Sequence, residues 1–273
     1  MRLGQRVFPI ETLSATSMMK AVACPEAWRR RYLLHEREGF GVDRFVGSVD
    51  HATIAGFMDD KKNTGMVWSP EQLFGAYSWC WDDELKKSEE GGEPPNFGTE
   101  DPGKLSDQGK LMVHTYVKEA ARHVEPIAVE SRFEEKVPGV PVPVIGYIDL
   151  ETQEKIIERK TSKTKVSKPR PGWQFQGKIY QLAQRKPVEW HVSTRQVTPQ
   201  VVTGITLPVV NPDPTVVMIQ SIWAMLNDYY QRYGTTSPWP TTGLFHPWMC
   251  GTCGYGPSHQ ASCVAWKDQT WAA

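Results

Sequence analysis

The sequence predicts an α/β fold, in which a mixed β-sheet flanked by helices follows a helical region and precedes a small cysteine-rich lobe. Three observations predict it: apolar residues repeat at helical spacing up to residue 124, Val- and Ile-rich segments of strand length follow, and three of the five cysteines lie near the carboxyl end. We expect a single domain over residues 1–273, made of a helical region at 12–124, a sheet core at 125–210, and a helix with the cysteine-rich tail at 211–273.

The amino-terminal region is expected to be helical. Residues 12–36 are predicted to form two short helices, because Ser and Thr residues suited to capping open the first and Pro25 suits the first position of the second. A polar stretch rich in Gly and Pro at 88–103 is predicted to be a loop. Further segments with helical spacing cover residues 47–59, 69–87 and 104–124.

The pattern changes after residue 124. Val and Ile become frequent in short segments, as expected for the strands of a sheet. The predicted strands are 125–137, 142–150, 155–160, 188–197 and 201–209, and the predicted helices are 172–185 and 214–233. This order of elements predicts an α/β core.

Composition places the chain among ordinary globular proteins, because 40% of its residues are hydrophobic and 23% are charged. Lys and Arg together number 31, as do Asp and Glu, so the overall charge indicates neither a nucleic-acid nor a membrane partner. No apolar run approaches the ~20 residues that span a bilayer. The opening residues, MRLGQRVFPIETLS, lack the apolar core of a signal peptide, so we expect a cytoplasmic protein.

The cysteine-rich tail, CGTCGYGPSHQASC, contains Cys250, Cys253 and Cys263. A CxxC pair followed by a third cysteine has the spacing of a metal or cluster site. The alternatives are buried thiols or a redox-active pair. A thioredoxin-type pair should open a helix after a strand, whereas this one lies in a loop of Gly, Pro and His, so the spacing favours a metal or cluster.

The segment GYIDLETQEKIIERKTS predicts a β-hairpin that carries ionisable residues. Asp149 ends the first strand, and Glu158 and Lys160 end the second. A two-residue turn at Gln153 and Glu154 would place Asp149 opposite Glu158, and alternation along the strand puts Glu158 and Lys160 on one face. Two carboxylates and a lysine should therefore converge.

Such a group suits metal-assisted hydrolysis of a phosphodiester. Carboxylates are ligands that Mg²⁺ and Mn²⁺ prefer, and a nearby lysine can neutralise charge on the phosphate. The alternative is a solvated edge with surface ion pairs, but the apolar neighbours Ile148, Ile156 and Ile157 favour a central hairpin. A run of basic residues that no acid interrupts then predicts a phosphate-binding track. Its members are Arg159, Lys160, Lys163, Lys165, Lys168 and Arg170.

Together these segments resemble the RecB-like branch of the PD-(D/E)XK nuclease superfamily, and within it the iron–sulfur members: the AddB nuclease domain, the exonuclease V type, the CRISPR-adaptation nucleases and related phage exonucleases. The resemblance covers most of the chain in five blocks that follow the family's order. The blocks are SATSMMKAVACPEAWRRRYL at 14–33, GSVDH at 47–51, Asp149 with IIERKTS at 156–162, QGKIY at 176–180, and the cysteine-rich tail.

The resemblance implies a restriction-endonuclease-like core with an amino-terminal helical insertion and a carboxyl-terminal iron–sulfur lobe. It implies a metal-dependent DNA exonuclease that acts on single-stranded ends. His51, Asp149 and Glu158 would bind Mg²⁺ or Mn²⁺ with the backbone carbonyl of Arg159, and Lys160 would be the catalytic lysine. Glu130 would be an outer-shell acid, and one helix face bearing Gln176 and Tyr180 would look toward the active site and the DNA, with ordinary helix packing as the alternative.

The resemblance also implies a 4Fe–4S cluster on Cys24, Cys250, Cys253 and Cys263, and leaves Cys80 as a buried thiol. Nine residues separate Cys253 from Cys263, a departure from many relatives that leaves His259 or Cys80 as alternatives for the fourth ligand and zinc as an alternative to the cluster.

The helical region would form one wall of a DNA channel, with Arg29–Arg31 either lining it or facing water. Two other functions stay open. One is a non-catalytic nucleic-acid-binding protein stapled by zinc or a cluster. The other is a nuclease subunit active only with a helicase or integrase-type partner. Repair, recombination, phage DNA processing and CRISPR spacer acquisition all use this scaffold, so a bacterial or phage-infected cell is the expected setting.

Overall fold

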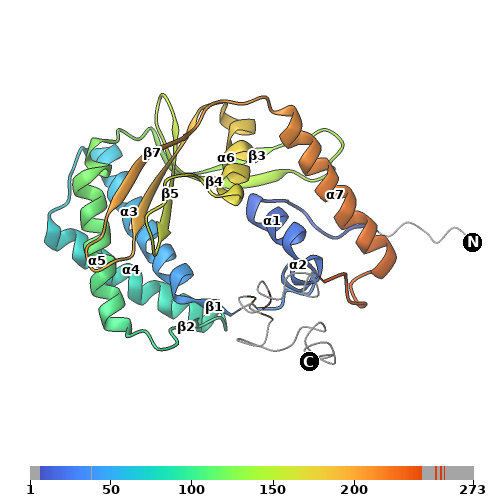
Figure 1. Ribbon diagram of the computed structural model, residues 1–273, viewed down its shortest axis with the longest axis horizontal. Coiled ribbons are helices and arrows are strands. Elements are labelled where there is room, and N and C mark those ends of the chain that lie inside the picture. The colour runs from blue at the N-terminus through green and yellow to red at the C-terminus, as the bar shows by residue number, and fades with distance from the viewer. Residues whose placement is uncertain (1–6, 38, 242–249, 251–252, 254, 256–273) are drawn as a thin grey trace, which may run out of the picture. The chain divides into compact units, whose positions relative to one another are not determined.

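The computed structural model describes residues 7–37 and 39–241 together with Cys250, Cys253 and Tyr255 (Figure 1). The chain divides into two compact units. The first comprises residues 1–39, 134–145 and 212–273, and the second comprises residues 40–133 and 146–211. Every residue of the predicted metal and catalytic site belongs to the second unit.

A five-stranded sheet carries the predicted catalytic strands, with the strand order β3-β4-β5-β6-β7 (Figure 1). β4 and β5 pair antiparallel, β5 and β6 parallel, and β6 and β7 antiparallel, so the sheet is mixed as the sequence predicts. The bounds of the strands are β3 Ala128–Glu135, β4 Val144–Glu151, β5 Ile156–Ser162, β6 Val188–Thr194 and β7 Val201–Leu207.

Helices of the second unit pack on both faces of this sheet. The register of β5 and β6 sets Arg159 beside His191 and Glu158 beside Trp190, so these two pairs point to opposite faces. The helices of this unit are α3 Val42–Thr64, α4 Pro70–Glu90, α5 Pro102–Glu119 and α6 Pro171–Gln184. α3 and α5 cover the face of Arg159, which binds Asp50, and of His191, which binds Tyr116. α6 covers the other face, where a Cβ on Gly177 would lie 3.0 Å from the Trp190 ring.

The main hydrophobic core lies between α3, α4, α5 and the sheet. α3 contributes apolar side chains at positions three and four apart, as a helix with one buried face requires. Gly109 lets α5 approach α4 closely, because a Cβ there would overlap the Tyr77 hydroxyl. The fully buried members of this core include Phe45, Val49, Ile54, Phe57, Met58, Tyr77, Met112, Tyr116 and Ile157.

The first unit contains α1 Ala15–Ala23, α2 Pro25–Tyr32 and α7 Asp213–Tyr233. Here one expectation is wrong: Arg29 and Arg30 neither face water nor offer a surface to DNA. Both are buried and form ion pairs with the fully buried Glu26, at 2.7 and 3.0 Å. The backbone nitrogen of Trp239 also donates to Glu26, so this carboxylate joins α2 to the chain after α7.

The predicted helices and main strands agree with the structure to within a few residues at their ends. The sequence did not predict the short parallel pair of β1 Phe40–Gly41 with β2 Pro95–Asn96, which falls partly within the expected loop at 88–103. Two-residue strands carry too little periodicity to detect. Among the described residues, no helix has the length and apolar character needed to cross a bilayer.

Candidate active site

Three potential metal ligands from three different elements converge in the second unit. They are His51 of α3, Glu130 of β3 and Asp149 of β4, and their ligand atoms all lie within 4.8 Å of one another. His51 Nδ1 is 3.5 Å from Asp149 Oδ2. The sequence analysis expected His51 and Asp149 here and placed Glu130 further out, so the structure brings Glu130 closer than the resemblance implied.

Glu130 reaches this position through an unusual backbone conformation. Its φ is +47°, in the left-handed region that non-glycine residues rarely adopt in a strand, at a cost on the order of 1–3 kcal/mol. Loss of hydration and then the negative charges of Asp149 and Glu158 raise the pKa of Glu130 to about 7. A cation between these groups would relieve that repulsion.

Asp149 lies where β4 and β5 stop pairing. The ladder between the two strands ends at Leu150 and Ile157, and beyond it Asp149 Oδ2 accepts a 2.7 Å hydrogen bond from the backbone nitrogen of Arg159. This register is the one that the two-residue turn predicted, and the turn closes with a 2.9 Å bond from Thr152 N to Lys155 O. Burial opposes ionisation of Asp149, but His51 and this hydrogen bond outweigh it and lower the pKa of the carboxyl.

Glu158 and Lys160 form the second half of the site on β5. Lys160 Nζ donates to Glu158 Oε1 at 2.7 Å, and Gln176 Nε2 donates to the same oxygen at 2.8 Å. The other oxygen, Glu158 Oε2, is buried and has no hydrogen-bond partner among the described residues. Burial, followed by the charge of Asp149, raises the pKa of Glu158. An unsatisfied buried carboxylate oxygen is a suitable ligand for a cation.

Gln176 and Tyr180 connect α6 to this group. Gln176 Oε1 accepts from Lys160 Nζ at 3.0 Å, and its Nε2 also donates to the Tyr180 hydroxyl at 2.6 Å. The hydroxyl in turn donates to the backbone oxygen of Tyr147 at 2.8 Å. The two residues share the helix face that looks onto β5, as their spacing predicts, and fix the orientation of Lys160 and Glu158.

This donor set fits a hard divalent ion. Two carboxylates with one imidazole lie together here, and carboxylate oxygens are the ligands that hard divalent ions prefer. Glu158, also a predicted ligand, lies outside the three described side chains whose ligand atoms meet within 4.8 Å, but the charge of Asp149 acts on its pKa and its Oε2 is unsatisfied. The residues present therefore fit Mg²⁺ or Mn²⁺.

Sequence reasoning missed a buried support on the opposite face of β5. Arg159 forms an ion pair with Asp50 of α3, donates to the Asp50 backbone oxygen at 3.2 Å, and lies 4.5 Å over the Tyr116 ring. The Tyr116 hydroxyl is 2.9 Å from His191 Nδ1, and His191 Nε2 is 3.0 Å from Glu189. The alternation of side chains along a strand could have revealed this support. Arg159 lies between Glu158 and Lys160, so it must point to the other face of the sheet and needs a buried partner there.

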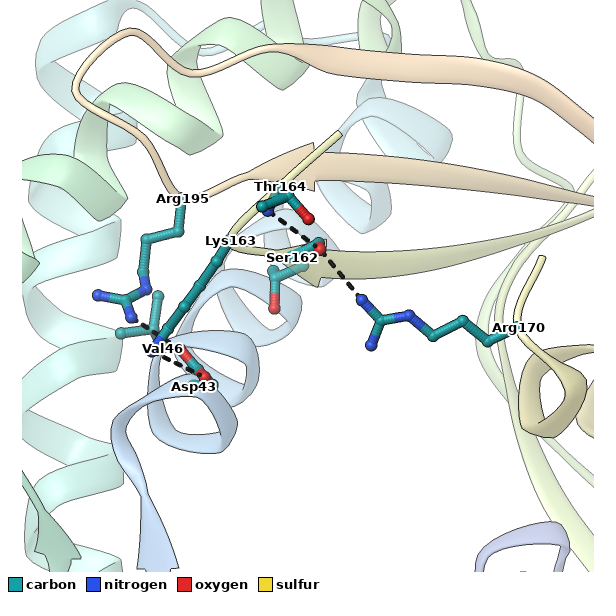
Figure 2. Close-up of a pocket in the computed structure, with 8 residues that line it drawn as sticks. Asp43, Val46, Ser162, Lys163, Thr164, Arg170 and Arg195 are labelled. Carbon is teal, nitrogen blue, oxygen red and sulfur yellow. Dashed lines mark hydrogen bonds and ion pairs between the residues drawn. The ribbon is translucent and has the colours of Figure 1, made fainter. Parts of the chain in front are cut away.

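The predicted basic track does not stay together: Arg159 is buried in its ion pair with Asp50 and cannot bind a phosphate, and Lys160 belongs to the candidate active site. Lys163 and Arg170 line one cavity, together with Asp43, Ser162 and Arg195 (Figure 2). Lys165 and Lys168 are exposed and do not line it. No described contact assigns these last two lysines a structural task.

The predicted cluster cysteines belong to the first unit and are only partly described. Cys24 and Cys253 both pack against Ala27 and Tyr255, and Cys253 N donates to Cys250 O at 3.2 Å. In this described part, the sulfurs of Cys24, Cys250 and Cys253 do not form a group within 4.8 Å of one another. Cys263 and His259 lie outside the described residues. Cys80 is buried in α4, as expected, and burial raises the pKa of its thiol.

Comparisons with known proteins found a matching family and similar solved structures. The sequence profile of the PD-(D/E)XK nuclease superfamily matches residues 12–256. Among solved structures, a candidate exonuclease from Eubacterium rectale is similar at a TM-score of 0.50 and 12% identity, over 86% of this chain and 85% of that one. The structure of SSO0001 is similar at a TM-score of 0.42 and 15% identity, over 95% and 89% of the two chains. Among curated protein sequences, none matches.

Proposed function

This chain belongs to the PD-(D/E)XK nuclease superfamily, and we propose that it is a metal-dependent DNA exonuclease that hydrolyses phosphodiester bonds at single-stranded ends. One observation carries the proposal: His51, Glu130 and Asp149 meet within 4.8 Å, beside the Glu158–Lys160 pair. The specialisation for ends follows the sequence resemblance, and it agrees with the name of the similar protein from Eubacterium rectale, a candidate exonuclease.

His51, Asp149 and Glu158 would hold Mg²⁺ or Mn²⁺, with Glu130 as a further carboxylate and the carbonyl of Arg159 as a backbone ligand. A bound divalent ion would supply Lewis-acid polarisation of the phosphate and would favour ionisation of the attacking water. The backbone nitrogen of Arg159 fixes Asp149, so the carboxylate is oriented before any ligand binds.

Lys160 would act on the phosphate directly. Glu158 and Asp149 overcome the effect of burial and raise the pKa of Lys160, so its ammonium group carries a positive charge. That charge would stabilise the negative charge that accumulates on the phosphoryl oxygens as water attacks phosphorus. Gln176, which bonds both Lys160 and Glu158 and is itself held by Tyr180, would keep the ammonium in place.

The proposed DNA contacts are Lys163, Lys165, Lys168 and Arg170, which follow the catalytic strand and are all exposed. Basic side chains in such a row bind the phosphate backbone without reading sequence.

A structural 4Fe–4S cluster on Cys24, Cys250, Cys253 and Cys263 is the remaining part of the proposal. The shared packing of Cys24 and Cys253 on Tyr255 supports it, since it brings two cysteines far apart in sequence to one small cluster. Four thiolates are the ligands that such a cluster requires. Its task would be to tie α2 to the tail.

A degradation assay tests the activity. End-labelled single-stranded DNA would be incubated with Mn²⁺ and either the wild-type protein, Asp149→Ala or Lys160→Ala, and strands blocked at the 5′ or 3′ end would give the polarity. We expect each variant to lose at least ~100-fold in rate. Lys86→Ala removes a charge from an exposed lysine on α4 and should degrade DNA like the wild type. Equal rates for wild type, Asp149→Ala and Lys160→Ala would refute the assignment.

A further inference from the structure

The cavity in Figure 2 lies at the end of the catalytic strand, outside the group that would hold the metal. Its volume is about 240 Å³. Its lining is almost entirely polar, with Val46 as the one apolar member of the described set. The lining residues are Asp43 and Val46 of α3, Thr161 and Ser162 of β5, Lys163 and Thr164 of the following loop, Arg170 at the start of α6, and Arg195 after β6.

We propose that this cavity is a phosphate subsite, which takes the strand phosphate next to the one that is cleaved. The proposal rests on the proposed nuclease function, because it assumes that the strand is bound at Lys160. Side chains alternate along β5, so Ser162 points to the same face as Glu158 and Lys160. At about 3.3 Å per residue, Ser162 lies about 7 Å beyond Lys160, which is comparable to the spacing of successive phosphates on a strand.

Arg170 is the side chain best suited to bind that phosphate. Its guanidinium lies 5.1 Å over the Trp173 ring and makes one long hydrogen bond, 3.3 Å from Nη2 to Ser162 Oγ. Among the described residues it makes no ion pair, so most of its donors are available to an anion. A guanidinium whose donors are mostly free can make a two-pronged bond to phosphate.

The opposite wall of the cavity is held in place by carboxylates. Arg195 binds Asp43 at 2.7 Å, and Lys163 lies 3.3 Å from the same carboxylate (Figure 2). Glu100 also binds Arg195, at 2.5 Å, and lies 3.9 Å from Lys163. Arg195 is therefore a positioning residue, since its charge is already compensated. Lys163 has a side chain 58% exposed and two longer ion pairs, so it can turn toward a phosphate.

The remaining polar groups also suit an anion. The hydroxyls of Ser162 and Thr164 line the cavity, and a hydroxyl can donate to a phosphate oxygen. α6 begins at Pro171, and Arg170 before it makes no side-chain cap, so the backbone N–H groups of the first turn are not satisfied by a capping side chain. These N–H groups add positive potential beside Arg170.

Oligonucleotide binding in EDTA tests this subsite without requiring catalysis. Wild type, Arg170→Ala and Lys165→Ala would be titrated with single-stranded oligonucleotides that each carry one uncharged methylphosphonate at a different position, with and without a terminal phosphate. Both substituted side chains are exposed, so both variants should fold, which their melting temperatures would check. Lys165→Ala is the matched control, because it removes one charge from the same loop outside the cavity.

For Arg170→Ala we expect binding weaker by about 10- to 100-fold on a normal oligonucleotide. The loss of affinity caused by Arg170→Ala should disappear when one particular phosphate is replaced by the neutral methylphosphonate. The smaller loss of affinity caused by Lys165→Ala should persist wherever the methylphosphonate is placed. If the Arg170→Ala penalty disappears when one internal phosphate is neutral, the subsite binds a phosphodiester. If it disappears only when the terminal phosphate is removed, the subsite binds a phosphomonoester. Either result supports a phosphate subsite.

An Arg170→Ala penalty that no single phosphate removes would overturn the subsite. The proposed nuclease would survive that result if the wild type still degraded DNA in a manner that depends on Asp149. Absence of both DNA binding and degradation by the wild type would instead refute the proposed function itself.

Discussion

The Asp50–Arg159 ion pair is the contact whose loss should damage stability and the metal site together. Asp50 immediately precedes His51 on α3, and Arg159 lies between Glu158 and Lys160 on β5. Asp50 is fully buried and Arg159 is 3% exposed. The pair therefore ties the helix that carries the histidine to the strand that carries the acid and the lysine.

Asp50→Asn would remove the charge and keep the volume. Arg159 would then remain buried as a cation without its counter-ion, a change that typically costs ~3–5 kcal/mol. The Asp50 backbone oxygen at 3.2 Å and the Tyr116 ring at 4.5 Å still stabilise the guanidinium, so we expect the free energy of unfolding to fall by the lower end of this range, ~3 kcal/mol. At roughly 2–4 °C per kcal/mol, the melting temperature should fall by about 6–12 °C.

Thermal unfolding of wild type, Asp50→Asn, Arg159→Met and the double variant would measure this loss. The double variant should be more stable than the sum of the single losses predicts, because it leaves no uncompensated charge. Mn²⁺ titration at a temperature where all variants are folded should show weaker binding for Asp50→Asn. Asp59→Asn, on the exposed side of α3, is the matched control and should melt like the wild type. The reasoning is refuted if Asp50→Asn melts together with Asp59→Asn, or if the single losses simply add.

Three further predictions address other parts of the structure. Glu130→Gln should weaken Mn²⁺ binding by roughly 10- to 100-fold in calorimetric titration, because it removes a carboxylate from the proposed site. The pKa of Glu189 is lowered to about 2, chiefly by its hydrogen bond with His191. The ionised carboxylate therefore stabilises the folded protein fully above its unfolded pKa of about 4.3, and this stabilisation is lost as pH falls toward 2. Urea unfolding should therefore show that Glu189→Gln lowers the free energy of unfolding more at pH 7 than at pH 3. Cys24→Ser should abolish visible absorbance and lower the melting temperature, whereas Cys80→Ser should keep the colour; a colourless wild-type protein purified without oxygen would count against the cluster.

The hairpin shows what the sequence could predict. Its register depends on a short turn and on alternation along two strands, and both are local properties. Asp149 opposite Glu158, and Glu158 on the face of Lys160, follow from those two facts alone. The spacing of Gln176 and Tyr180 likewise places them on one helix face, and the structure brings that face onto Lys160.

The rest of the site depends on contacts between elements far apart in sequence. Nothing local marks Glu130 as a residue with a left-handed backbone, because it lies inside a predicted strand and a non-glycine residue rarely adopts that conformation. The network of Tyr116, His191 and Glu189 spans 75 positions between its first two members, so only the packed fold brings them together. Asp50 is one acid in a helix that carries several, and its burial becomes evident only once Arg159 is placed.

Both faces of β5 carry buried charges, and each face has a different reason to keep them. Replacing a buried ion pair with apolar residues is often neutral or stabilising, so stability alone does not explain the retention of Asp50 and Arg159. The position of the pair explains its retention, because an apolar pair would tolerate sliding of α3 along β5, whereas an ion pair with a backbone contact permits one register. That register decides whether His51 lies 3.5 Å from Asp149 or a helical turn away. The strain at Glu130 fits the same account, because a site that must gather repelling carboxylates needs neighbouring structure rigid enough to hold them before a cation arrives.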